Sequence, residues 1–296
     1  MNLIVTATSQ GLLWGVMALG IFITFRILDL PDMTAEGSFP LGAAVCAKLI
    51  LSGVHPIIAT LVAFISGMLA GAITGFLITK CNIPGLLAGI LTMTGLYSIN
   101  LRIMGRANLS LLGKEKLNDL LRPLHLPAQF DTILIGLIIV VAVILLLILF
   151  FNTELGQALI ATGDNEIMAR SLGVSTNKTK ILALMLSNGM IAFAGGLITQ
   201  DNGYADISMG IGTIVIGLAS VIIGEVVFGN LSLGNRLICV ILGAIIYRLI
   251  ITFVLVIGLQ PNDLKLFSAT ILAICLALPS LRSKLNLNFF AKKEEA

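Results

Sequence analysis

Long uncharged runs separated by short polar segments make up most of the chain. A helix needs roughly 20 residues to cross a hydrocarbon core about 30 Å thick, and several runs have this length. They cover residues 1–25, 49–79, 81–101, 132–151, 181–200, 207–224, 237–262 and 266–281, with a break at 52–56 and one charge, Arg248, inside 237–262. The pattern predicts an all-α, polytopic helical membrane protein with about nine transmembrane or broken helices, forming a single transmembrane domain over 1–296.

A β-barrel is disfavoured by the same pattern. Barrel strands alternate apolar and polar residues over about ten positions, whereas these runs are continuous. Helices also satisfy their own backbone hydrogen bonds, which lipid cannot do. The composition agrees, because 57% of the 296 residues are apolar and 11% are charged, with a mean hydropathy of +1.06. These values exclude a soluble enzyme, a disordered chain and a fibrous protein.

The remaining composition excludes several kinds of binding site. The net charge is +3, and the basic residues form no dense stripe, so we expect no nucleic-acid partner. The four cysteines are scattered without a CxxC pair, and His55 and His125 have no ligand spacing. We therefore expect neither a metal site nor a catalytic residue on this chain.

Basic residues in the polar segments predict the orientation in the membrane. Lys and Arg are enriched on the cytoplasmic side, and residues 282–296 contain Arg282, Lys284, Lys292 and Lys293. We therefore expect 282–296 to be a cytoplasmic tail. Counting back through nine spans places 152–180 in the cytoplasm, and 105–131 and the N-terminus outside.

Two groups of residues inside the apolar runs invite a structural interpretation. Gly67, Gly71 and Gly75 share one helix face, which predicts a seam for close helix packing rather than a solute contact. Ionisable residues near spans are costly and often functional. Glu225 and Arg236 are expected to pair at the cytoplasmic face. Arg248 lies about 18 Å deeper along its helix, so we expect it to face a pore, reach the interface or bind a loop carboxylate.

Residues 152–180 contain a short helix with its own start and stop signals. Asp164 and Asn165 are N-cap residues, and Glu166 follows in the first turn, where a carboxylate suits the helix dipole. Gly173 fits the left-handed position after the helix. Met168 and Leu172 then share one face. A helix this short needs a surface to rest on, either this protein or a partner.

A second polar interruption, residues 200–206, resembles the segment 29–42. Both are acidic, contain glycine and precede a helix rich in small residues. Interruptions in corresponding halves of a transporter mark transport sites, although a short surface loop explains 200–206 equally well.

The segment 156–165 (Gly-Gln-Ala-Leu-Ile-Ala-Thr-Gly-Asp-Asn), followed by 169–174 (Ala-Arg-Ser-Leu-Gly-Val), resembles the cytoplasmic coupling segment of ABC importer permeases for branched-chain amino acids and simple sugars. Lys178 and Lys180 match its basic residues, and 192–196 match the small-residue run of the next helix. Residues 34–42 resemble the family's N-terminal broken helix. Within them, the sequence Glu36-Gly37-Ser38-Phe39-Pro40 is similar to the corresponding sequence in permeases for aromatic amino acids.

This resemblance implies a bacterial cytoplasmic (inner) membrane protein that imports a small solute, with an amino acid as the expected cargo. It implies two ABC ATPase subunits that hold ATP and Mg, an extracytoplasmic solute-binding protein, and a second permease copy, for which we expect a homodimer rather than a heterodimer. The chain itself would hold no cofactor, since Gly113-Lys114-Glu115 is no phosphate-binding loop. The residues implied in coupling to the ATPase are Gly163, Asp164, Asn165, Met168, Ala169, Arg170, Leu172 and Gly173.

Polar side chains inside apolar helices are the candidates for the solute path. They are Thr92, Thr94, Tyr97, Asn100, Ser187 and Asn188. Such residues more often make interhelical hydrogen bonds than line a pore, and both interpretations stay open at this point.

Two rival functions compete with an ATP-driven importer. An ion- or proton-coupled secondary transporter needs carboxylates near the middle of the bilayer, where these spans offer almost none. An intramembrane enzyme needs paired acids, a nucleophile with a base, or metal ligands at depth, and the sequence shows no such set.

Overall fold

The computed structural model describes residues 2–117, 119, 130–229, 232–256, 266–270 and 272–273. Its α-helices are α1 (Asn2–Phe22), α2 (Ala35–Leu51), α3 (Pro56–Thr79), α4 (Gly85–Met104), α5 (Phe130–Phe151), α6 (Glu154–Asp164), α7 (Glu166–Ser171), α8 (Thr176–Asn202), α9 (Thr213–Phe228) and α10 (Leu233–Val256). The π-helical turn η1 (Ile23–Ile27) continues α1, and the 3₁₀ turn η3 (Ile207–Gly210) precedes α9. The predicted tail 282–296 lies outside the described residues.

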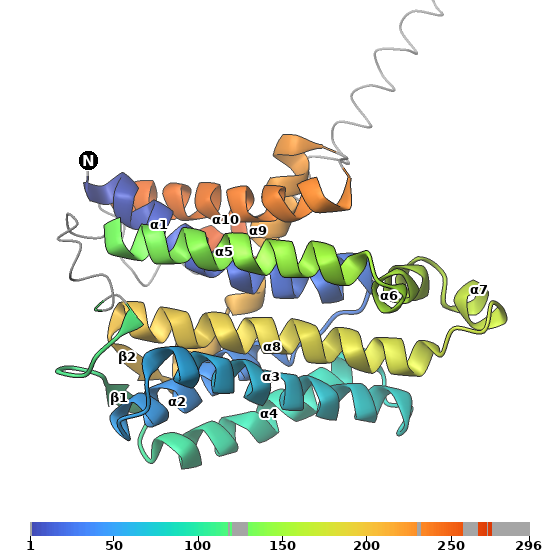
Figure 1. The fold of residues 1–296 in the computed structure, drawn as a ribbon, viewed down its shortest axis with the longest axis horizontal. Coiled ribbons are helices and arrows are strands. Elements are labelled where there is room, and N and C mark those ends of the chain that lie inside the picture. Colours follow the sequence, from blue (N-terminus) through green and yellow to red (C-terminus); the bar gives the residue numbers. More distant parts are fainter. Residues whose placement is uncertain are drawn as a thin grey trace, which may run out of the picture.

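The long helices run side by side in one bundle (Figure 1). Within the described residues, seven helical stretches are long and apolar enough to cross a membrane. The prediction of a polytopic helical membrane protein is therefore confirmed. Helix α2 has 17 residues with Pro40 inside and is not among these seven stretches. Most of the predicted last run, 266–281, lies outside the described residues.

Helix α8 is central to the packing and contacts α3 along the glycine seam. A Cβ at Gly67 or Gly71 would collide with the carbonyl oxygens of Asn188 and Leu184, and one at Gly75 would press on Ile181. The glycine side of α3 therefore lets two backbones approach closely, which increases dispersion contacts between helices where lipid supplies no hydrophobic driving force.

The chain between α1 and α2 turns back into the bundle. Gly20 lies against Ser187 of α8, and a Cβ at Gly163 would collide with the Ile27 carbonyl oxygen beside α6. The chain then runs back toward α8, where the Asn188 side chain donates a hydrogen bond to the Asp32 carboxylate. Asn188 is twelve residues from the first residue of α8 and fourteen from its last. Helix α2 consequently begins near the middle of the bundle.

A small two-stranded sheet covers one end of the bundle, and α7 projects from the other (Figure 1). Strand β1 (Asn108–Ser110) pairs antiparallel with β2 (Tyr204–Asp206), Leu109 lying opposite Ala205. The first residues of α1 lie at the sheet end (Figure 1). The N-terminal end of α1 and the described start of 105–131 thus share one side, opposite 152–180, as the span count predicts.

Candidate functional site

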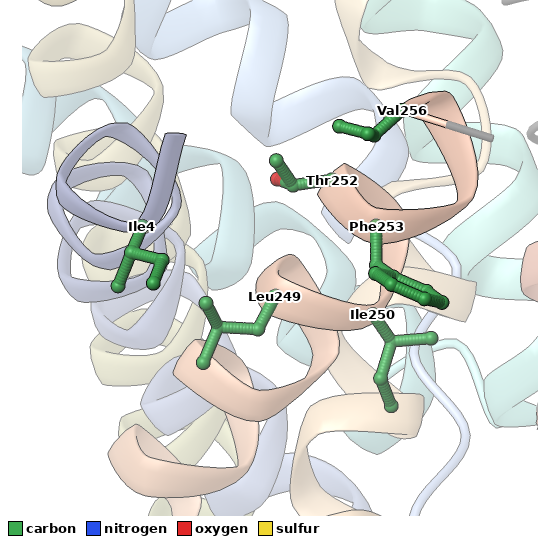
Figure 2. A pocket seen from close by; sticks show the side chains of 6 residues that line it. All are labelled: Ile4, Leu249, Ile250, Thr252, Phe253 and Val256. Carbon is green, nitrogen blue, oxygen red and sulfur yellow. The ribbon is translucent and has the colours of Figure 1, made fainter. Parts of the chain in front are cut away.

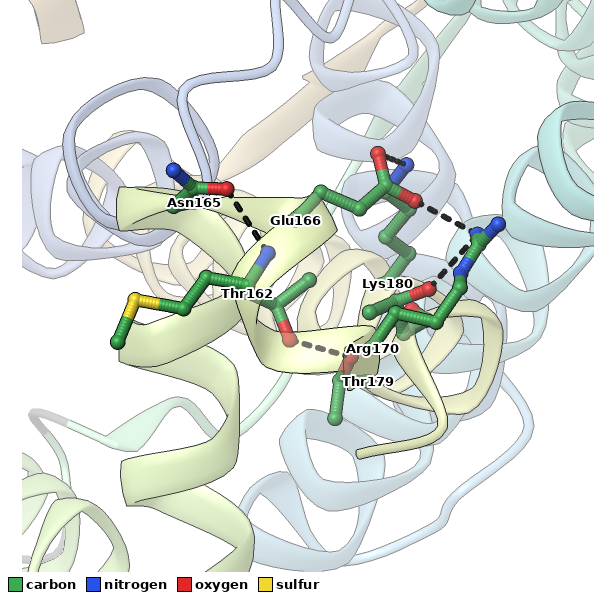
Figure 3. Close-up of polar contacts among 8 residues, drawn as sticks. Thr162, Asn165, Glu166, Arg170, Thr179 and Lys180 are labelled. Carbon is green, nitrogen blue, oxygen red and sulfur yellow. Dashed lines mark hydrogen bonds and ion pairs between the residues drawn. The ribbon is translucent and has the colours of Figure 1, made fainter. Parts of the chain in front are cut away.

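Helix α7 begins after Asn165, one of the predicted cap residues, and ends before Gly173 as predicted, whereas Asp164 is the last residue of α6 and not a cap of α7. The Asn165 side chain caps it, Oδ1 accepting a hydrogen bond from the Met168 backbone N–H at 3.0 Å (Figure 3). Gly173 follows the helix with φ +87°, the left-handed conformation that glycine adopts without steric cost. The predicted short helix is therefore confirmed.

A charged cluster holds α7 against the start of α8. Lys180 Nζ donates to Glu166 Oε2 at 2.7 Å, and Arg170 pairs with Glu166 Oε1 at 3.2 Å (Figure 3). The hydrogen bond from Lys180, together with its positive charge, holds the pKa of Glu166 below its ordinary value. Thr162 and Thr179 hydroxyls share a further hydrogen bond of 3.0 Å, tying the end of α6 to α8. These contacts orient α7 as a rigid projection.

The outer face of α7 is apolar and exposed. Ile167 is 84% exposed, Met168 60% and Leu172 72%, whereas Ala169 is buried beneath the helix. Met168 and Leu172 share this face as predicted, and Ile167, which was not predicted to belong to it, is the most exposed of the three. An apolar group of this kind on a projecting element is typical of a protein-binding surface.

Residues 152–180 contain a second helix that the sequence analysis did not predict. Helix α6 precedes α7, and the Thr153 hydroxyl caps it by accepting from the Gly156 N–H at 3.3 Å. The segment is therefore not a loop with a single helical turn. The signal was present, because Thr153 and Glu154 form the same N-cap pattern as Asn165 and Glu166.

A cavity of about 290 Å³ lies between α2, α4 and η3. Three of the six predicted path residues line it, namely Thr94, Tyr97 and Asn100 of α4. The other lining residues, which the prediction left out, are Glu36, Gly37, Pro40, Met93, Ile207, Ser208 and Ile211. The first predicted interruption, 29–42, meets the segment that follows the second one, 200–206, at this cavity, because Glu36 Oε1 accepts the Gly212 backbone N–H at 3.0 Å.

The other three predicted path residues are buried in interhelical hydrogen bonds. Thr92 accepts from Thr74 at 3.0 Å, Ser187 donates to the Gly20 carbonyl at 2.7 Å, and Asn188 donates to Asp32 at 2.7 Å. They do not line the cavity. The structure thus divides the predicted set into cavity-lining residues on α4 and packing residues on α4 and α8.

Two carboxylates lie deeper in the bundle than the sequence pattern indicates. Asp32 reaches Asn188 near the middle of α8, and Glu36 stands in the first turn of α2. Both belong to the predicted interruption 29–42, and their depth follows from the backward turn of the chain, which run lengths alone do not reveal. A charge inside a broken helix was the signal.

The charged residues near the membrane form two different arrangements. Glu225 pairs with Arg236 at 2.6 Å, as expected, and also with Arg26 at 2.8 Å, which the sequence analysis missed. Arg248 instead lies over the Trp14 ring, 4.2 Å from its centroid. This cation–π contact holds the guanidinium between helices α10 and α1.

A second hollow, of about 490 Å³, lies between the start of α1 and the end of α10 (Figure 2). Its lining is apolar apart from the Thr252 hydroxyl, with Ile4, Leu249 and Phe253 among its side chains. It therefore lacks the polar groups that orient a polar solute. Among the residues that the structure describes, no group of three or more His, Cys, Asp or Glu side chains could hold a metal ion.

Comparisons with known proteins agree with this architecture. The family described as "Branched-chain amino acid transport system / permease component" matches residues 3–277. The tyrosine transport system permease protein of Clostridioides difficile is 41% identical over 100% of this chain and 96% of its own length. An uncharacterized protein of Rickettsia prowazekii is 36% identical over 94% of this chain and 98% of its own length. The autoinducer 2 import system permease protein LsrC of Yersinia pseudotuberculosis is 30% identical over 66% of this chain and 54% of its own length.

The family match covers nearly every span described above, and the first relative aligns along the whole chain. The family consists of permeases of ABC transport systems and is not an enzyme family. This multi-pass protein of the bacterial inner membrane therefore belongs to the branched-chain amino acid transport system permease family.

Proposed function

We propose that the chain is the membrane-spanning subunit of an ATP-driven importer of aromatic amino acids. The exposed apolar face of α7 carries this proposal. Ile167, Met168 and Leu172 point away from the bundle on a helix whose caps and ion pairs leave it little freedom. Exposing such a face costs free energy unless a partner covers it, and a separate ATPase subunit that holds ATP and Mg is the partner we propose.

The proposed coupling is mechanical. Movement of an ATPase subunit pushes α7, and α7 transmits the push to α8 through Glu166 and Lys180 and to α6 through Asn165, whose backbone N–H donates to the Ala161 carbonyl at 3.1 Å. Helix α8 lies against α2 and α3, so the displacement reaches the helices around the 290 Å³ cavity. The cavity then opens alternately to either side of the membrane.

The amino-acid cargo is inferred from the tyrosine transport system permease, which is 41% identical to this chain along its whole length. We propose that a solute-binding protein delivers the cargo at the end that carries β1 and β2. Helix α4 exposes Thr94, Tyr97 and Ser98 at helical spacing. Polar side chains on an outer helix face suit a second permease copy and a solute path better than lipid.

Co-purification with an ATPase subunit tests the coupling surface. Leu172→Asp places a charge on the apolar face of α7, and Leu112→Asp makes the same change at an 86% exposed leucine near β1. We expect wild type and Leu112→Asp to co-purify with a nucleotide-binding subunit and to import L-tyrosine in proportion to ATP hydrolysis. Leu172→Asp should fold normally but lose both properties.

Two results would contradict the proposal. If Leu172→Asp retains the ATPase subunit and coupled uptake, α7 is not the coupling surface. If wild-type uptake survives ATP depletion but collapses with the ion gradient, the chain works as a secondary transporter, for which Asp32 and Glu36 would supply the central carboxylates.

A further inference from the structure

The cavity between α2, α4 and η3 has an unusual balance of polar groups. Glu36 is the acidic residue of its lining, and none of the lining residues is Lys, Arg or His. Thr94, Tyr97 and Ser208 contribute hydroxyls, and Met93, Pro40 and Ile211 contribute apolar walls. Hydrogen-bond acceptors without a balancing cation suit a positively charged group on a ligand.

The backbone of α9 fixes the position of Glu36. Its Oε1 accepts the Gly212 N–H at 3.0 Å, so the carboxylate lies at the N-terminal end of α9. Gly212 has no side chain to cap this end, and the helix dipole stabilises a negative charge there. The carboxylate is therefore held in place at the edge of the cavity.

Asn100 supplies a second and independent indication of a ligand. The residue is fully buried, and its Nδ2 donates to the Gly37 carbonyl at 3.2 Å. Its Oδ1 is buried and has no hydrogen-bond partner in the described structure. An orphaned buried acceptor costs about 1–3 kcal/mol, so its presence in a cavity wall indicates that a donor arrives there in another state.

We propose that Glu36 and Asn100 bind the ammonium group of the transported amino acid. The Glu36 carboxylate supplies the opposite charge, the Asn100 Oδ1 accepts a second N–H, and Tyr97, which lines the same cavity, adds an aromatic ring to the site. This inference rests on the proposed amino-acid import and adds the group of the solute that the membrane subunit itself recognises. The cargo must then carry a free ammonium.

Binding of three related compounds tests the inference. The permease complex is purified in lipid nanodiscs without the solute-binding protein, and binding of radiolabelled L-tyrosine is measured with two competitors. Tyramine keeps the ammonium and lacks the carboxylate, whereas 3-(4-hydroxyphenyl)propionate keeps the carboxylate and lacks the ammonium. We expect tyramine to compete at least about tenfold better, the difference that one charge-assisted hydrogen bond makes.

Matched variants separate ligand binding from a structural role. Glu36→Gln keeps the oxygen that accepts the Gly212 N–H and removes only the charge, so the unfolding midpoint should stay near that of wild type while the affinity for L-tyrosine falls about tenfold or more. Glu115→Gln makes the same change at an exposed residue outside the cavity and should leave both values unchanged. Asn100→Leu removes the unpartnered Asn100 Oδ1. If Glu36→Gln fails to fold, the affinity of Asn100→Leu for L-tyrosine tests the ammonium site instead.

The outcomes distinguish this inference from the proposed function. If Glu36→Gln and Asn100→Leu bind L-tyrosine as wild type does, or if the propionate competes as well as tyramine, the ammonium site is wrong. It is also wrong if the importer takes up L-tyrosine while the purified complex shows no preference for an ammonium. If the wild-type importer takes up no L-tyrosine, the proposed function itself is wrong.

Discussion

Helix α7 and the cavity at the start of α2 are held together in opposite ways. The polar contacts of α7 join residues close in the sequence, such as Asn165 with Met168 and Glu166 with Lys180. The cavity depends on contacts across the chain, such as Glu36 with Gly212, which lie 176 positions apart. Local contacts leave α7 able to unfold by itself, whereas the cavity depends on the whole bundle.

The two regions also expose opposite chemistry. On α7, apolar side chains face outward where water is expected, whereas at the cavity polar side chains such as Tyr97, which is 57% exposed, line a hollow between apolar helices. Both arrangements cost free energy in the isolated chain. Under the functions proposed above, each region is completed by a molecule that the chain does not contain, an ATPase subunit at α7 and a solute at the cavity.

Ala169→Glu should give the largest effect on stability, and this effect should be confined to α7. Ala169 is 2% exposed, and an unpaired buried carboxylate costs roughly 3–5 kcal/mol, which a six-residue helix cannot offset. We expect faster amide hydrogen exchange in 165–173 and loss of coupled ATP hydrolysis, with the unfolding midpoint of the bundle unchanged. Ala161→Glu, the same change at an exposed residue of α6, is the control. A lowered midpoint in Ala169→Glu would contradict the independence of α7.

Gly210→Ala should destabilise the whole bundle instead. The added Cβ would collide with the Glu36 carbonyl oxygen and crowd Pro40, and such overpacking costs about 1–3 kcal/mol. Thermal unfolding of the purified permease should shift to lower temperature, while exchange in 165–173 stays as in wild type. Gly95→Ala adds the same methyl where no atom lies within 4 Å. Equal midpoints for the two variants would show that the junction of α2 and η3 tolerates adjustment.

Lowering the pH should give the smallest of the three effects, a slight loss of stability confined to α7. The Lys180 hydrogen bond lowers the pKa of Glu166 from its ordinary value of 4.5, so the ion pair stabilises α7 fully above pH 4.5 and ceases to do so as the pH falls through the lower folded value. The Glu166 side chain is 37% exposed, which limits the effect to less than about 1 kcal/mol. The protection factors of the amides in 165–173, which compare measured exchange with the intrinsic rate at the same pH, should fall below pH 4.5 in wild type, and Glu166→Gln should show no such step.

Some features of both regions were predicted from the sequence, and others were not. The start of α7 at Asn165 and its end before Gly173 were predicted because capping depends on neighbouring residues alone. The pair Glu225 and Arg236 was predicted because a short connection joins their helices. Arg26 was missed as the second partner of Glu225, since it lies 199 positions away. Thr92 and Thr94 look equivalent in the sequence, yet Thr92 bonds to Thr74 and Thr94 lines the cavity.

The sequence by itself determined the membrane-spanning helices, the glycine seam on α3 and the local design of α7, because hydrophobic run length, residue spacing and capping are properties of neighbouring residues. Only the tertiary structure decided that the chain before α2 turns back to the middle of α8, and that Glu36 and Asn100 therefore border one cavity. The physical reason is that a helix which begins inside the bundle, as α2 does, is positioned by contacts with distant helices, such as the hydrogen bond between Ser38 and Asn188. No local sequence pattern specifies which helices these are.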